Sequence, residues 1–412
     1  QIMKRKNILF LRSGFHKEFA LKSMIEAGFD LIVVDEPNSS LLPFAKRMYT
    51  IDNKWDENEM FSIAKQAYIE NDCLGIISFL DSSTIAYGML SDYFNLNYFS
   101  EETARILSNK IRVRELLTKE GLNSVNFCTA KSVSEIYDAM ETWKTPVVIK
   151  PSDRSASKGV VIVRDSKDIE AAYKESLLYS KNKEILVEEY IEGIEYCAEY
   201  FIVDSTPYIM AVSEKEVLNE KYCVELKDVT PARLPLEDYD KINKYLSKVI
   251  RAIGFNNGIV HIELKKENDM ISIIEINSRC AGGNLLESVY HLSGYNPYTN
   301  LANLLCKVRD EVSIPKLIDY NADSLFTIFD TFSYKGRSGV IKKIENTQVF
   351  NEIKRYPEEK FFLYVNKGNF VGETENNEDS IGSIYLMDKE YDSLITRCKQ
   401  LEDSIGVYVG DE

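Results

Sequence analysis

The chain has 412 residues, of which 44% are hydrophobic and 28% are charged, and its formal net charge at pH 7 is −15. This length predicts about two to three domains, and the mixed composition is typical of a globular protein. The negative charge argues against a nucleic-acid-binding surface, because neutralising phosphates requires a cationic stripe.

Seven cysteines and three histidines are scattered along the chain. The odd cysteine count and the lack of a C-x-x-C pair indicate reduced thiols in a cytoplasm, and the spacing argues against a zinc site. No apolar run approaches the roughly 20 residues that span a membrane, and the amino terminus shows no signal-peptide pattern. We therefore expect a cytoplasmic protein that binds neither membrane nor nucleic acid.

The first hundred residues alternate between strand and helix patterns. The apolar runs that predict buried strands are 7–11, 29–34 and 75–80, and the segments with helical spacing are 17–27 and 56–70. Ser13-Gly14 lies between the first strand and the first helix. With a single glycine it does not match the G-x-G-x-x-G fingerprint, so we interpret it as a plain βα turn in a small parallel α/β domain.

The pattern changes after a helical stretch predicted over residues 100–121. The predicted strands that follow are 146–150, 159–163, 185–188, 196–203, 208–214, 258–265 and 270–276, with a helix near 167–179. This order predicts an α+β domain of mainly antiparallel strands. About a hundred residues follow position 308, and the residues alone leave their role open.

Two strands within residues 259–279 carry the most informative side chains. Alternation with period two places His261 and Glu263 on one face, and Glu275, Asn277 and Arg279 on one face of the next strand. Two carboxylates and a carboxamide form a set of hard oxygen ligands, which Mg²⁺ prefers. These residues could instead line the wet face of a hairpin. Against that, Glu275 stands between Ile274 and Ile276, where an unpaired charge is expensive.

A second motif covers residues 147–163. A strand delivers Lys150, a loop of small polar residues follows, and Gly159 opens the next strand. Small residues let backbone N–H groups approach phosphate oxygens, although a flexible hairpin loop explains the pattern as well.

A third motif covers residues 186–200, where a strand ends at Glu188 and Glu195 begins the next one. Such a linker can hydrogen-bond the edge of an adenine, and the later carboxylate can bind ribose hydroxyls. Taken alone, an acidic hairpin is also explained by solvation.

These three motifs, in this order, resemble the ATP-grasp superfamily over roughly residues 100–298. The most specific piece is Glu275-Ile-Asn277-Ser-Arg279, with Glu263 twelve residues upstream. Because a parallel α/β domain precedes them, the layout is similar to the carboxylate–amine ligases. That group includes L-amino-acid (dipeptide) ligases, glycinamide ribonucleotide synthetase and biotin-carboxylase-like enzymes.

The resemblance implies a fold of α/β plus α+β parts. It implies a Rossmann-like, pre-ATP-grasp domain over residues 1–100 and an ATP-grasp core over 101–308, with a mobile lid at about 126–190. A C-terminal subdomain over 309–412 would complete the substrate cleft.

The resemblance also implies roles for individual residues. Those expected to bind ATP are Lys110, Lys150, Ser155, Ser157, Gly159, Glu188, Glu189, Tyr190, Ile191 and Glu195. Those expected to bind Mg²⁺ or Mn²⁺, as two ions, are Glu263, Glu275 and Asn277. Those expected to hold the reacting acyl-phosphate are Arg279, Gly282 and Gly283. Those more loosely matched to the substrate are Lys215, Lys221, Arg233 and His261.

Within the ATP set, the two lysines would bind the α- and β-phosphates, and the loop ending at Gly159 would close over the triphosphate. Glu188 would accept a hydrogen bond from the adenine amino group, and Glu195 would bind the ribose.

The implied activity is ATP-dependent formation of an acyl-phosphate from a carboxylate, followed by attack of an amine. The Cys280–Asn284 segment lacks the Val-Glu-His pattern of biotin carboxylases, whereas its glycine pair is similar to the amino-acid ligases. Lys227-Asp228 departs from the Gly-His pair that those ligases often carry, so the acyl substrate stays open. The alternatives are a purine-pathway ligase, a biotin-carboxylase-like enzyme and a non-catalytic nucleotide-binding scaffold. The expected partners are small carboxylates and amines, and a homodimer is compatible with the sequence.

Overall fold

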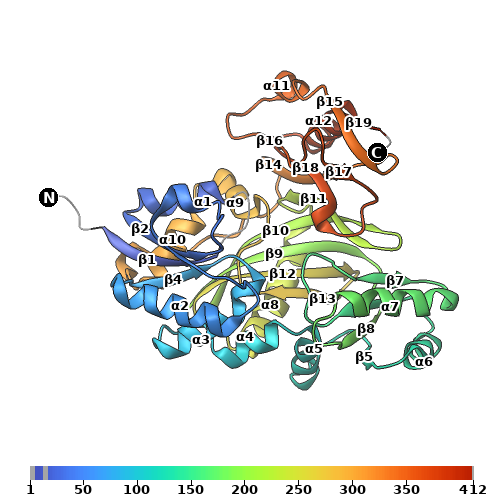
Figure 1. The fold of residues 1–412 in the computed structure, drawn as a ribbon, viewed down its shortest axis with the longest axis horizontal. Helices are drawn as coiled ribbons and strands as arrows, with labels where there is room; N and C mark the ends of the chain where they lie inside the picture. Colours follow the sequence, from blue (N-terminus) through green and yellow to red (C-terminus); the bar gives the residue numbers. More distant parts are fainter. Residues whose placement is uncertain (1–4, 13–16, 411–412) are drawn as a thin grey trace.

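The computed structural model describes residues 5–12 and 17–410. Figure 1 shows the N-terminal elements, a small green sheet and the C-terminal elements grouped around a large central sheet. The predicted Ser13-Gly14 turn lies outside the described residues. The predicted mixture of α/β and α+β parts is confirmed. No helix within the described ranges is long and apolar enough to cross a membrane.

The N-terminal sheet is parallel, with the strand order β3-β2-β1-β4. Its strands are β1 (Lys6–Leu11), β2 (Phe29–Asp35), β3 (Ala45–Thr50) and β4 (Gly75–Ser78), and its helices are α1 (Glu18–Glu26), α2 (Glu57–Glu70) and α3 (Thr84–Tyr93). The strands predicted at 7–11, 29–34 and 75–80 are confirmed. The sequence did not predict β3, because its residues are mostly half-buried or exposed and show no apolar run.

The single helix predicted over 100–121 is two helices, α4 (Glu101–Leu107) and α5 (Lys110–Lys119). The break has a local cause at Asn109. Its backbone is extended, and its side chain accepts hydrogen bonds from the N–H groups of Ile111 and Arg112, which caps a new helix. This second start places Lys110 in the first turn of α5, facing the central sheet.

The small green sheet has the antiparallel order β5-β8-β6-β7 and its own apolar core. Its elements are β5 (Phe127–Ala130), α6 (Val133–Trp143), β6 (Val147–Pro151), β7 (Val161–Val163), α7 (Ile169–Tyr179) and β8 (Ile185–Glu189). This sheet occupies the range in which a lid was predicted. The domain boundaries and the mobility of the lid stay predictions.

The central sheet has eight antiparallel strands in the order β13-β12-β9-β10-β11-β14-β18-β16. These are β9 (Ile194–Val203), β10 (Thr206–Asn219), β11 (Cys223–Thr230), β12 (Gly258–Glu267), β13 (Met270–Asn277), β14 (Phe326–Ser333), β16 (Lys360–Leu363) and β18 (Ser380–Asp388). The last hundred residues thus extend this sheet by three strands.

The remaining elements cover the central sheet or form a small sheet with the order β17-β15-β19. They are α8 (Leu236–Ile253), α9 (Leu285–Ser293), α10 (Pro297–Leu305), β15 (Gly339–Glu345), α11 (Val349–Ile353), β17 (Phe370–Val371), α12 (Tyr391–Ser404) and β19 (Gly406–Gly410).

Helix α10 joins the N-terminal sheet to the central one. Tyr98 donates a hydrogen bond to the Leu305 carbonyl at 2.8 Å, and one apolar core runs through both sheets. A Cβ at Gly75 would lie 2.5 Å from that carbonyl oxygen, so this close approach requires glycine. The packing fixes the end of β4 beside the end of β13.

Candidate active site

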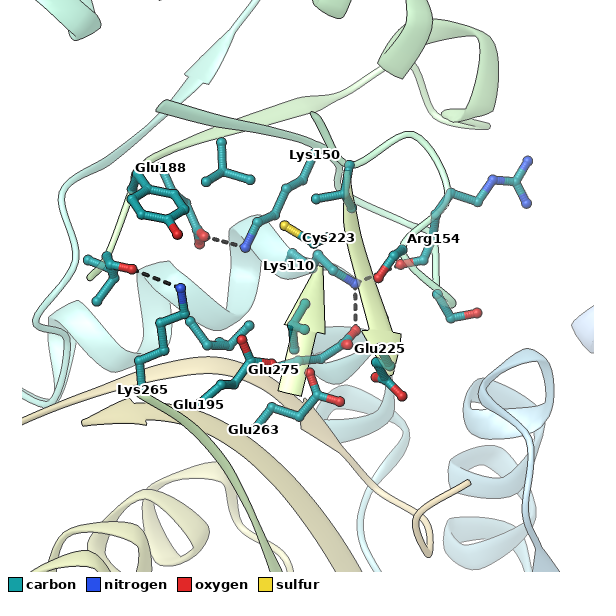
Figure 2. Close-up of a pocket in the computed structure, with 18 of the residues that line it drawn as sticks. Lys110, Lys150, Arg154, Glu188, Glu195, Cys223, Glu225, Glu263, Lys265 and Glu275 are labelled. Atoms are coloured by element: carbon teal, nitrogen blue, oxygen red, sulfur yellow. Dashed lines mark hydrogen bonds and ion pairs between the residues drawn. The ribbon is translucent and has the colours of Figure 1, made fainter. Parts of the chain in front are cut away.

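A pocket lies between the small green sheet and the polar face of the central sheet (Figure 2). Nine of the ten residues predicted to bind ATP line it, together with the two predicted acidic metal ligands. The lining residues are Lys110, Val148, Lys150, Arg154, Ser155, Ser157, Val160, Glu188, Glu189, Tyr190, Ile191, Glu195, Val217, Cys223, Glu225, Glu263, Lys265, Ile274 and Glu275.

The tenth residue, Gly159, shapes the loop between β6 and β7 rather than lining the pocket. Ala156, Ser157 and Gly159 all have left-handed backbones, with φ of 59°, 58° and 71°. A Cβ at Gly159 would lie 2.9 Å from Pro151 and Tyr179, so glycine is required there. Left-handed non-glycine residues are uncommon and cluster at functional sites.

Glu188 is buried between two cations at the inner end of the pocket. One carboxylate oxygen accepts from Arg114 Nε and the other from Lys150 Nζ, both at 2.5 Å. Burial alone would raise the pKa of Glu188, but Arg114 and Lys150 outweigh it and lower that pKa to about 2. Each carboxylate oxygen accepts from one cation, so Glu188 holds Lys150 in place at the pocket. Its implied role as an acceptor for the adenine amino group stays a prediction.

Lys110 joins the loop to the acidic strand pair. Its Nζ donates to Glu275 Oε1 at 2.7 Å and to the Arg154 carbonyl at 2.6 Å (Figure 2). Burial lowers the pKa of Lys110, but the charge of Glu275 overrides it and the net shift is upward. Lys110 therefore stays cationic where the loop meets β13.

The two predicted acidic metal ligands face each other across the β12–β13 hairpin, with Glu263 in register with Glu275. Glu263 Oε1 accepts from Lys215 Nζ at 2.8 Å and lies 3.4 Å from His261 Nε2. Burial opposes ionisation, yet Lys215 and His261 hold the pKa of Glu263 well below its usual range. Paired ionised carboxylates are hard oxygen donors, so this set fits Mg²⁺.

Glu263 and Glu275 form the acidic floor of the pocket. Asn277 and Glu195 lie on the same pair of strands or on the strand next to them. Asn277 is buried opposite His261 and is not among the lining residues. Glu195 lines the pocket, and burial raises its pKa to about 7, against the opposing charge of Lys215.

Arg279 forms a bidentate ion pair with Asp81, which follows β4 in the N-terminal sheet. Nε and Nη2 donate to the two carboxylate oxygens at 2.6 and 2.7 Å. Nearby, Gly283 has φ of 56°, and a Cβ there would lie 2.2 Å from the Phe329 ring. The sequence analysis did not identify Asp81, although an acid directly after a parallel strand is a signal for a site at that edge.

The four loosely matched substrate residues separate into two pairs. Lys215 and His261 are buried on the floor beside Glu263. The other two lie away from that floor, and none of the four is among the residues that line the pocket. Lys221 pairs with Glu175 of α7 at 3.3 Å, and Arg233 stacks over the Tyr391 ring at 3.4 Å.

Lys265 was not identified from the sequence, yet it lines the pocket. Its Nζ donates to the Ile191 carbonyl at 2.9 Å and lies 4.6 Å from the Tyr190 ring centroid. It therefore holds the segment expected to contact the adenine. Its place two residues after Glu263, on the same strand face, is the signal that could have identified it.

Comparison with known proteins agrees with this geometry. Residues 143–287 match the ATP-grasp domain family. An uncharacterized protein of Sinorhizobium fredii is 26% identical over 216 residues, which cover 51% of this chain and 44% of that protein. The L-arginine-specific L-amino acid ligase of Bacillus subtilis is 21% identical over 87% of this chain and 86% of its own length.

Two solved structures share the whole fold. The L-amino acid ligase of Bacillus licheniformis aligns with a TM-score of 0.82 at 19% identity, over 99% of this chain and 100% of that one. Phosphoribosylglycinamide synthetase of Anaerococcus prevotii aligns with a TM-score of 0.72 at 20% identity, over 98% and 100%. Residues 143–287 thus match an ATP-grasp domain, and the chain as a whole shares its fold with these two enzymes.

Proposed function

We propose that the chain is an ATP-dependent ligase that activates the carboxylate of an amino acid and couples it to an amine. The observation that carries this proposal is the arrangement around the pocket. Glu263 and Glu275 face each other across adjacent strands, Lys110 and Lys150 lie above them, and Arg279 lies at the end of the same hairpin. The nearly full-length similarity to L-amino acid ligases supports an amino-acid substrate.

The proposed reaction has two steps. An oxygen of the substrate carboxylate attacks the γ-phosphorus of ATP, the bond to the bridging oxygen breaks, and ADP leaves with an acyl-phosphate formed. An amine then attacks the acyl carbon, the carbon–oxygen bond to phosphate breaks, and phosphate leaves with the amide formed. The chain's contribution is to position the reactants and neutralise charge, because phosphoryl transfer requires little covalent chemistry from the protein.

Individual residues have distinct parts in this scheme. Lys110 and Lys150 would hold the phosphates, and the loop through Ser155 and Ser157 would cover them with backbone N–H groups. Arg279, which Asp81 orients, would bind the oxygens of the activated carboxylate.

Glu263, Glu275 and Asn277 would hold Mg²⁺, and two ions are proposed. When bound at these residues, Mg²⁺ would supply positive charge that offsets the negative charge of the transferred phosphoryl group. Lys110 and Lys215 already pair with the two carboxylates, so they hold these side chains in place across the hairpin. We also propose a cytoplasmic location, and a homodimer as the assembly to test.

A purine-pathway ligase is the second candidate. The full-length fold similarity to phosphoribosylglycinamide synthetase favours it. That activity would need a separate site for a phosphoribosyl group beside the nucleotide pocket.

The test is phosphate release from ATP and Mg²⁺ with each amino acid, singly and in pairs. We expect release that requires an amino acid and disappears in Glu275→Gln. If no amino acid gives phosphate release while ATP still binds, amino-acid ligation is rejected and the purine-pathway ligase is favoured. If the wild type does not bind ATP, the assignment of the pocket as a nucleotide site is rejected.

A further inference from the structure

One polar face of the central sheet forms the floor of the pocket, and this face extends along the sheet beyond the pocket. Alternate residues of β9 share this face with their partners on β12, namely Glu195 with Lys265, Cys197 with Glu263, and Glu199 with His261. Glu195, Lys265 and Glu263 line the pocket, whereas Glu199 and His261 are not among its lining residues. The row of charged side chains is therefore longer than the nucleotide site.

Glu199 has one oxygen in use and one without a partner. The residue is 1% exposed, and its Oε1 lies 2.5 Å from His261 Nδ1. Its Oε2 is buried and has no hydrogen-bond partner within the part of the chain that the structure describes. Buried polar atoms are nearly always paired, and a carboxylate oxygen accepts hydrogen bonds. The missing partner is therefore a donor.

Glu199 lies toward the end of the hairpin where Arg279 is held, because it is paired with His261. His261 stands opposite Asn277, and the chain runs from Asn277 through Arg279 into the turn at Cys280. The pKa of the Cys280 thiol is raised mainly by burial, and the negative charge of Glu199 adds a smaller upward contribution. Glu199 is thus within electrostatic reach of the turn that begins beside Arg279.

We infer that Glu199 binds the α-ammonium group of the amino-acid substrate through Oε2. A primary ammonium carries the opposite charge and three donors, which suits a carboxylate with one oxygen unpaired. Arg279 would hold the carboxylate end of the same molecule. The inference rests on the proposed ligase function and names the feature by which the substrate would be selected.

A metal ion is the less favourable occupant. Cys197, Glu199 and His261 offer ligand atoms within 4.8 Å of one another. However, the short contact between His261 Nδ1 and Glu199 Oε1 occupies two of the atoms that a metal would need.

The experiment compares two substrates in three proteins. The substrates are the standard amino acid that gives the fastest phosphate release with the wild type, and its 2-hydroxy analogue. The proteins are the wild type, Glu199→Gln, and Glu267→Gln, in which an exposed acid of the same hairpin is changed. Thermal shift with Mg·ATP verifies that each variant folds and binds nucleotide.

We expect the wild type to prefer the amino acid by roughly 100-fold in kcat/KM, because a buried acceptor left unpaired penalises the analogue. Glu199→Gln should lose most of that preference, while Glu267→Gln keeps it. An unchanged preference in Glu199→Gln, or equal wild-type rates with both substrates, would overturn the inference and leave the ligase function standing. If no amino acid gives release although Mg·ATP binds, the ligase function fails and the inference with it.

Discussion

Arg279 and Asp81, which are 198 residues apart, form a bidentate ion pair that joins the end of β13 to the segment that follows β4. Nη1 of Arg279 also donates to the Cys280 carbonyl at 3.0 Å. Burial opposes ionisation of Asp81, but Arg279 overrides it and lowers the pKa of that carboxyl. The N-terminal sheet therefore fixes the orientation of the arginine expected to face the reacting carboxylate.

Replacing this acid tests the positioning role. We expect Asp81→Asn to lower kcat by about 10- to 100-fold, because a misplaced guanidinium stabilises the transition state less well. KM for ATP should change little, since Asp81 does not line the nucleotide pocket. Steady-state kinetics measure both values. Asp72→Asn, the same change at an exposed turn, is the control, and equal kcat in the two variants would contradict the role.

The lowered pKa of Glu188 predicts how the free energy of unfolding depends on pH. Its pKa in the folded chain is about 2, below the ordinary value of 4.5, so its contribution is present above pH 4.5 and is lost as pH falls toward 2. The full shift corresponds to about 3 kcal/mol. We expect Glu188→Gln to lower the free energy of unfolding by about 3 kcal/mol at about pH 7. At about pH 3 this loss should be smaller by roughly 2 kcal/mol.

Denaturant unfolding of both proteins at the two pH values measures this difference. A gap that stays constant with pH would show that Glu188 is not the titrating group. Glu184→Gln, a nearby acid outside the pocket lining, controls for the loss of one charge.

The loop of residues 152–160, which is proposed to cover the phosphates, contacts the C-terminal part of the chain. Asn377 donates its backbone N–H to the Ala156 carbonyl at 3.3 Å, and its Oδ1 accepts from the Glu225 N–H at 3.0 Å. Glu378 pairs with Lys158 at 2.7 Å. These contacts hold the loop in its present position over the pocket.

We expect Asn377→Ala to raise KM for ATP by about 3- to 10-fold. The change removes the side-chain hydrogen bond to Glu225, of about 1 kcal/mol, and so loosens the segment whose backbone N–H contacts the loop at Ala156. Hydrogen exchange of residues 152–160 should become faster without nucleotide. Asn377→Asp keeps the acceptor and should behave like the wild type. Identical exchange in all three proteins would contradict the coupling.

The prediction from sequence succeeded where the information is local. Period-two alternation placed Glu263 and Glu275 on one floor, and apolar runs located the strands that carry Lys150 and Glu188. The helix break at Asn109 was missed, because an N-cap inside a periodic stretch competes with the pattern around it.

The parts that were missed depend on contacts between distant segments. Asp81 reaches Arg279 only when two sheets pack, and Arg114 reaches Glu188 from a helix 74 residues upstream. Lys221 and Arg233 were matched where the alignment is loose, and their side chains contact Glu175 and Tyr391 instead. No one-dimensional pattern encodes such pairings.

Gly283 offers a test of packing at the turn. A Cβ would lie 2.2 Å from Phe329, and the backbone is left-handed, so Gly283→Ala is strained in two ways. We expect a loss of about 1–3 kcal/mol of unfolding free energy. In the double variant that adds Phe329→Leu, the unfolding free energy lost through the clash between the added Cβ and the Phe329 ring should be recovered. Gly282→Ala, with no atom within 4 Å of its added Cβ, should cost less.

The measurement that tests the central claim most directly follows oxygen from the substrate into phosphate. The active amino acid is labelled with oxygen-18 in its carboxylate, and the released phosphate is analysed by mass spectrometry. An acyl-phosphate mechanism predicts one labelled oxygen in each phosphate, because the oxygen that attacked the γ-phosphorus leaves with it. Phosphate that carries no label would contradict carboxylate activation and would assign the release to hydrolysis of ATP by water.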